Sequence, residues 1–77
     1  MADMINHPPH YTKGKVECLD AIEAATTDLK GMEAVFTAQI IKYIWRWKWK
    51  NGIEDLQKAQ FYLVRLMHYV KKEKDNG

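Results

Sequence analysis

Cysteine, proline and glycine are scarce in this 77-residue sequence, which contains one, two and four of them. The single cysteine, Cys18, cannot pair within the chain, so we expect a small buried residue and a reducing cytoplasm. No apolar run approaches the roughly 18 residues that a membrane span needs, and we find no apolar leader segment. The sequence therefore predicts a cytoplasmic protein without a membrane partner.

The sequence also contains none of the familiar phosphate-binding or zinc-binding motifs. There is no Gly-x-x-x-x-Gly-Lys-Ser/Thr loop, Gly-x-Gly-x-x-Gly turn, Cys-x-x-Cys pair or His-Glu-x-x-His helix. The three histidines and Cys18 lack metal-ligand spacing, so we expect no metal site and no tightly bound cofactor. A net charge of +2 is too small to argue for nucleic acid, which makes nucleic-acid binding the weakest hypothesis.

What is abundant is apolar residues, at 47% of the chain, which is too many for a disordered protein. At this length one core supplies only about 3–5 kcal/mol of net stability. We therefore expect the domain to form a homo-oligomer.

Apolar periodicity predicts an all-α fold, in which a short N-terminal helix packs on a long antiparallel helical hairpin. Asn51-Gly52 separates the two long helices, and Asn51 with Glu54 has the spacing of a capping box. We expect a single domain over 1–77, with an extended arm at 1–15 and helices at 16–25, 32–50 and 52–73.

The second helix is apolar on two sides, and its tryptophans are all near its end. Phe36, Tyr43 and Trp47 fall on one stripe, while Trp45 and Trp49 fall on another. A second apolar stripe needs a second burial surface. We expect self-association through this aromatic surface.

Cations run along the edge between those two stripes. Lys42, Arg46 and Lys50 are spaced by four residues, which predicts a positive ridge along one helix edge. On the third helix, cations alternate with aromatics at Lys58, Tyr62, Arg65 and Tyr69. Guanidinium and ammonium groups bind phosphate, and aromatic faces stack on bases at about 1–3 kcal/mol each. The alternative is an ordinary solvated surface with cation-π packing.

Polar groups of the N-terminal third could add to such a site. A run of donors surrounds a glycine and could contact a phosphate or a base; its members are His10, Tyr11, Lys13 and Gly14. Glu17 and Asp20 lie three apart on one helix face, where they could act as a base or pair with the ridge. The alternative readings are a solvated arm and surface ion pairs.

Three separated blocks resemble one known family. They are residues 6–23 (NHPPHYTKGKVECLDAIE), 41–46 (IKYIWR) and 55–63 (DLQKAQFYL). In this order they resemble the small bacteriophage SaV-like family, a domain of unknown function that is often labelled a phage nucleotide kinase. The resemblance covers most of residues 6 to 63.

The resemblance implies a nucleotide-binding protein of the infected bacterial cytoplasm. In that reading Lys42, Arg46 and Lys58 hold phosphate, and Tyr11 or Tyr62 stacks on a base. Other pattern positions are His10, Gly14, Glu17, Asp20, Tyr43 and Asp55. The enzyme it implies is a phosphotransferase acting on (deoxy)nucleoside monophosphates without a Walker loop. Catalytic candidates are Glu17, Asp20 and Asp55, one of which could instead orient the cations or a sugar hydroxyl. Mg²⁺ would arrive with the nucleotide.

Two other functions compete with the kinase. One is an oligomeric sponge that sequesters a cyclic or modified nucleotide signal of host antiviral defence, which needs charge and stacking but no catalytic residue. The other is an inhibitor that docks its tryptophan-rich stripe on a host protein.

Overall fold

Three helices make up most of the computed structural model, which describes residues 12–13 and 16–76. They are α1 (Cys18–Thr26), α2 (Met32–Arg46) and α3 (Ile53–Asn76). A short 3-10 helix, η2 (Trp47–Trp49), follows α2. The described part of the chain is mostly helical, as predicted, although two short strands depart from an all-α fold.

The predicted bounds of the first helix are wrong at its start. Val16–Glu17 form a two-residue strand, β2, which pairs antiparallel with β1 (Thr12–Lys13) in the register Thr12↔Glu17 and Lys13↔Val16. Helix α1 therefore begins at Cys18 instead of residue 16. It ends where Thr26 and Thr27 turn their hydroxyls back to donate to the carbonyls of Ile22 and Glu23, at 2.7 and 2.8 Å.

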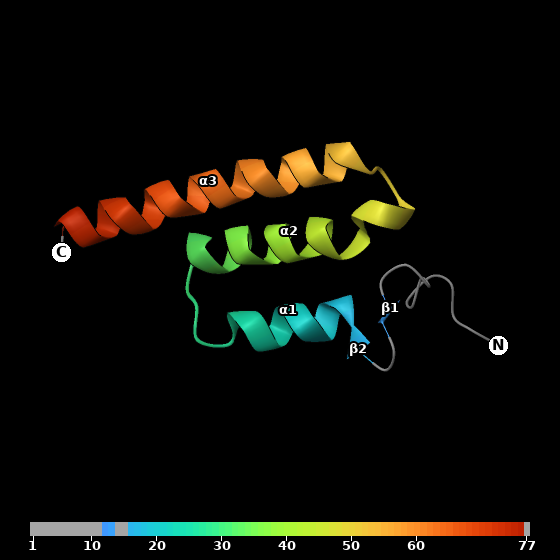
Figure 1. Cartoon of the computed structure of the whole chain (residues 1–77). Coiled ribbons are helices and arrows are strands. Elements are labelled where there is room, and N and C mark those ends of the chain that lie inside the picture. Colours follow the sequence, from blue (N-terminus) through green and yellow to red (C-terminus); the bar gives the residue numbers. More distant parts are fainter. Residues whose placement is uncertain (1–11, 14–15, 77) are drawn as a thin grey trace.

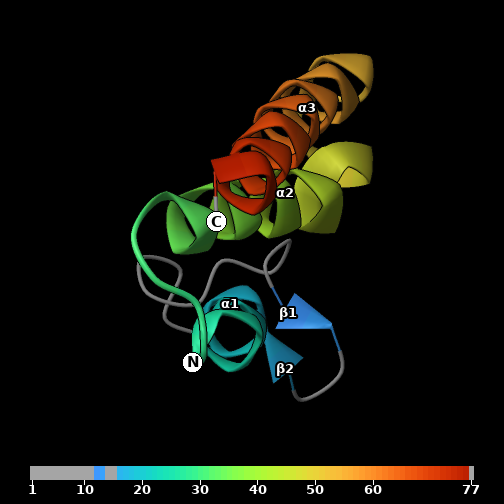
Figure 2. The same cartoon turned by 90° about the vertical axis from the view of Figure 1, so that its left-hand side faces the viewer.

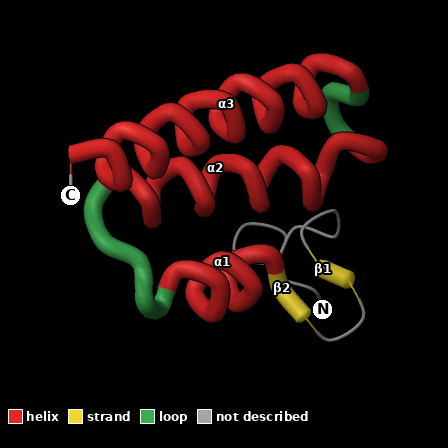
Figure 3. The backbone as a smooth tube through the Cα atoms, turned by 60° about the vertical axis from the view of Figure 1, so that its left-hand side comes forward, coloured by secondary structure: helices red, strands yellow, loops and turns green. Residues whose placement is uncertain are grey.

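Helices α2 and α3 form an antiparallel hairpin, and α1 lies along the other side of α2 (Figure 1). Seen end-on, the three helices follow one another roughly in a row (Figure 2). Helix α2 thus occupies the middle of a single layer, and each of its two neighbours covers one of its sides (Figure 3).

The core of this layer is small and aromatic. Phe36 of α2 contacts two rings of α3, Tyr62 at 6.3 Å and Tyr69 at 6.4 Å between centroids. Tyr43 stacks on Tyr62 with centroids 6.0 Å apart and rings 6° from parallel. Ala59 of α3 is also buried, and its small side chain allows the two helices to approach closely.

The predicted second helix is also too long, since α2 stops at Arg46 rather than residue 50. The chain tightens into η2 and then reverses at Gly52, whose φ of 55° lies in the left-handed region. The Gly52 amide donates to the carbonyl of Trp47 at 2.7 Å and closes the turn. Helix α3 starts one residue later than predicted and continues to Asn76.

Replacing Gly52 by alanine should cost about 1–2 kcal/mol of the free energy of unfolding. A Cβ at this position meets nothing within 4 Å, so the cost comes from the positive φ and not from a clash. Gly52→Asn is the matched control, because asparagine tolerates the left-handed region and should lose less than alanine. Urea unfolding measures both, and equal losses would show that the positive φ is not the cause.

Candidate functional site

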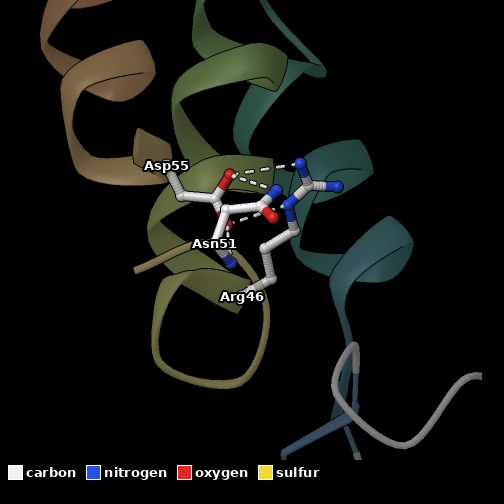
Figure 4. A network of polar contacts seen from close by, with 3 residues as sticks. All are labelled: Arg46, Asn51 and Asp55. Carbon is white, nitrogen blue, oxygen red and sulfur yellow. Dashed lines mark hydrogen bonds and ion pairs between the residues drawn. The ribbon is translucent and has the colours of Figure 1, made fainter. Parts of the chain in front are cut away.

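A buried ion pair joins the end of α2 to the first turn of α3. The Arg46 guanidinium donates to both carboxylate oxygens of Asp55, with Nε and Nη2 each at 3.2 Å from an oxygen (Figure 4). The Asp55 side chain is 0% exposed and that of Arg46 is 11% exposed. The two charged groups are therefore held out of water in the bidentate geometry that favours such a pair.

Asn51 completes the set of donors around this carboxylate. Its backbone amide and its side-chain Nδ2 donate to the two oxygens of Asp55 at 3.2 and 3.3 Å. The predicted capping box is thus wrong in its partner, because Asp55 and not Glu54 reaches back to Asn51. Asp55 lies inside the hairpin, where only a carboxylate that is hydrogen-bonded on both oxygens is tolerated.

The pKa of Asp55 is set by two opposing effects. Burial raises it, but the hydrogen bonds from Arg46 and Asn51 and the positive charge of Arg46 outweigh burial, so the pKa lies below its ordinary 3.8. A carboxylate that is ionised, enclosed and already accepting four hydrogen bonds is poorly placed to take a proton from a substrate. We therefore assign Asp55, one of the three catalytic candidates, a role in stabilising the fold.

The expected ridge of Lys42, Arg46 and Lys50 does not form, because α2 ends at the middle member. Lys50 follows the 3-10 turn and is exposed, and Arg46 turns into the hairpin toward Asp55. Sequence periodicity could not reveal this break, since the residues of η2 continue the apolar pattern of the helix.

A different cluster of cations surrounds the ring of Tyr43. Lys42 Nζ lies 4.5 Å, Arg46 Cζ 4.9 Å and Lys58 Nζ 5.5 Å from its centroid. The ring itself is buried and stacked on Tyr62. The structure therefore brings together five predicted site residues from two helices: Lys42, Tyr43, Arg46, Lys58 and Tyr62.

Two grooves open on the hairpin, and the first of them borders this cluster. The first has a volume of about 350 Å³ and is lined by Tyr43, Glu54, Gln57, Lys58, Phe61 and Tyr62. Phe61 is 58% exposed and meets the Tyr62 ring edge-on, with centroids 5.3 Å apart. An exposed ring beside a lysine is suited to a flat ligand that carries negative charge.

The second groove, of about 580 Å³, is lined by Met32, Phe36, Val64, Arg65, His68, Tyr69 and Lys72. Our site prediction did not include Phe61, His68 or Lys72. The signal that could have found the basic row is the spacing of Lys58, Arg65 and Lys72 by seven residues, which puts three cations on one edge of α3.

The two N-terminal candidates whose side chains the structure describes, Glu17 and Asp20, are not part of this cluster. Asp20 is exposed on α1 and Glu17 is half-buried in β2, and α2 separates both elements from α3 (Figure 1). Lys13 belongs to β1, while His10, Tyr11 and Gly14 lie outside the described residues.

Within the described residues, no three His, Cys, Asp or Glu side chains gather closely enough to hold a metal ion. None of the helices there combines the length and apolarity that crossing a membrane requires.

Asp55→Asn should cost about 3–5 kcal/mol of the free energy of unfolding, because it leaves the buried Arg46 without its counter-charge. This is comparable to the net stability of so small a domain, so we expect the variant to be largely unfolded at neutral pH. The double variant Arg46→Met with Asp55→Leu replaces both charges by apolar groups and should recover much of the loss. Urea unfolding at pH 7 compares the three proteins, and a stable Asp55→Asn protein would contradict the role of the pair.

The same pair predicts a loss of stability in acid. Because the folded pKa of Asp55 is depressed, its contribution to stability is fully present above the ordinary, unfolded pKa of 3.8 and disappears as pH falls through the lower folded pKa. The double variant keeps every other carboxylate but lacks this one, so its free energy of unfolding should fall less below about pH 4. If the free energy of unfolding fell equally with pH in the wild type and in the double variant, Asp55 would not contribute to the loss of stability in acid.

Comparison with known proteins identifies a family. Residues 5–64 match the family of proteins of unknown function DUF3310. No curated protein and no solved structure matches the chain. The matched segment contains the Arg46–Asp55 pair, the Tyr43 cluster and the first groove. Since it covers well over half of the sequence, this chain belongs to the DUF3310 family.

Proposed function

We propose that this protein binds a nucleotide through the cationic face of the α2–α3 hairpin, which we define by Lys42, Lys58, Arg65 and Lys72. The observation that carries the proposal is the arrangement of Lys42 and Lys58 around the Tyr43 ring, next to a groove with an exposed Phe61. Positive charge and an accessible ring face are the two requirements for holding a phosphate and a base together.

The first groove is suited to the base. Tyr43 is stacked on Tyr62 and buried, so neither of its faces is open to a ligand. Phe61 provides the accessible ring instead, and Tyr62 supports it edge-on. Gln57 and Glu54, which also line the groove, can form hydrogen bonds with the edge of a base.

The row of Lys58, Arg65 and Lys72 is suited to the phosphates. Steps of seven residues along a helix separate neighbouring cations by about 10.5 Å and the outer two by about 21 Å. Such a row offers phosphate contacts at well-separated points, which favours a ligand with more than one phosphate group. A dinucleotide or cyclic dinucleotide would extend from the first groove toward the second.

The geometry favours a protein that binds a nucleotide without catalysis over a phosphotransferase. Asp55 is fully occupied by Arg46 and Asn51, and Asp20 lies on α1, away from the groove. The protein would then act as a sponge for a cyclic or modified nucleotide, with Mg²⁺ entering only as part of the ligand. This version requires no proton transfer by the protein.

The kinase remains the second candidate, because the sequence blocks resemble the SaV-like phage family that carries this label. A phosphotransferase relies chiefly on positioning and positive charge, both of which the cationic face offers. Both versions place the protein in the cytoplasm of an infected bacterium. An inhibitor of a host protein is the remaining alternative if no nucleotide binds.

Lys58→Gln and Arg65→Gln should each weaken nucleotide binding about tenfold, a loss of about 1.4 kcal/mol. A thermal-shift screen of nucleoside mono-, di- and triphosphates and cyclic dinucleotides identifies the ligand. At one hundred times its dissociation constant, the ligand adds about 2.7 kcal/mol to stability. Lys30→Gln is the matched control, because it removes one exposed positive charge from the loop between α1 and α2. Equal affinities in all three variants would exclude the cationic face, and no shift with any ligand would favour the host-protein inhibitor.

Turnover separates the sponge from the kinase. After long incubation with the bound nucleotide, a triphosphate donor and Mg²⁺, we expect the nucleotide to be recovered unchanged. Formation of a diphosphate from a deoxynucleoside monophosphate would establish the kinase instead. Lys58→Gln serves here as the control for a contaminating host kinase, since loss of product in this variant would tie turnover to the cationic face.

A further inference from the structure

The opposite side of the hairpin is aliphatic and uncovered. It carries Ile53, Leu56, Leu63, Met67 and Val70 of α3 and Ile44 of α2, which we define as the aliphatic face. Ile53 is 65% exposed, Met67 is 55% exposed, and the others except Leu56 are nearly half exposed. Because the three helices lie in one layer, no helix of the described chain covers this face (Figure 2).

The stacked pair Tyr43 and Tyr62 shows which residues share a side. Ile44 follows Tyr43 and Leu63 follows Tyr62 in the sequence. Each of these two side chains therefore points 100° around its own helix axis from the tyrosine that makes the contact. In an antiparallel pair of right-handed helices these two residues lie on the same side. The residues that precede the two tyrosines, Lys42 and Phe61, lie on the other side with the grooves.

The spacing along α3 is that of a helix-packing seam. Residues 53, 56, 60, 63, 67 and 70 alternate by three and four, which is the heptad pattern that packs against another helix. Five of the six residues are aliphatic, and the sixth, Gln60, is uncharged. The seam therefore runs from Ile53 to Val70 of α3 without a charged side chain.

We propose that a second copy of this chain covers the aliphatic face, so that two hairpins form a four-helix core. A copy suits the face because both partners are then uncharged at the contact, while their cations remain on the outer sides. Two layers of helices also give a larger buried core than one layer can provide. The interface is thus the aliphatic face, and the exposed Trp49 need not take part.

Sedimentation velocity on the full chain tests the proposal. We expect the wild type to sediment as a dimer of 9.1 kDa chains, and Leu63→Lys to weaken the dimer at least tenfold. Phe61→Lys is the matched control, since Phe61 is similarly exposed two residues earlier on the opposite side of α3. It should leave the dimer intact. A monomeric wild type, or a dimer that Phe61→Lys disrupts and Leu63→Lys does not, would overturn the proposal.

Two further measurements keep the test decisive if Leu63→Lys fails to fold. The melting temperature of the wild type should rise with protein concentration, as it does when folding is linked to association. Gln60→Leu removes the one polar side chain of the seam and should tighten the dimer without touching the cationic face. A melting temperature independent of concentration, or a Gln60→Leu dimer no tighter than the wild type, would contradict the proposed interface. Neither readout involves a nucleotide, so its outcome is separate from that of the binding screen.

Discussion

The hairpin depends on the ion pair between Arg46 and Asp55. Arg46 is the last residue of α2 and Asp55 lies in the first turn of α3, so one bidentate contact determines how the second helix leaves the first. Since the carboxylate is fully enclosed, it can be placed only where Arg46 and Asn51 meet both of its oxygens. Any shift of α3 along α2 would leave a buried charge without donors, which is far more costly than losing an apolar contact.

That fixed placement also sets the register of the aromatic core. Tyr43 stacks on Tyr62 and Phe36 lies between Tyr62 and Tyr69 only when the helices start from the Arg46–Asp55 contact. With the register set, the residues on either side of the contact are divided into two opposed surfaces. Lysines, Arg65 and an exposed Phe61 gather on one, and aliphatic side chains on the other.

Much of the helical fold could be predicted from the sequence, because apolar periodicity and Asn51-Gly52 mark helices and their junction directly. The end of α2 could not, since Trp47 and Trp49 continue the apolar pattern while the backbone tightens into a 3-10 turn. Asp55 could be predicted as a group that orients a cation, but its burial could not, for a related reason. Spacing alone does not distinguish a carboxylate that faces a ligand from one that turns inward to an arginine nine residues earlier. Lys42, Tyr43, Lys58 and Tyr62 were brought together as expected. The row through Arg65 to Lys72 has a seven-residue spacing that is visible in the sequence, but only the grooves distinguish it from other surface cations.

The division into two surfaces has a consequence for how binding and association would combine. Phe61 and Leu63 are two residues apart on α3 and therefore point in nearly opposite directions. A nucleotide on the cationic face and a second chain on the aliphatic face would touch different side chains of the same helix. Each site would then be complete within one chain, and a dimer would bind two ligands independently. Coupling between nucleotide binding and dimer formation would have to pass through the aromatic core, where the stacked Tyr43 and Tyr62 rings lie beneath the first groove. The Arg46–Asp55 contact holds that stack in one register, so there is no second packing of the rings for a ligand to select. Without a second packing there is no free energy of coupling between the two sites.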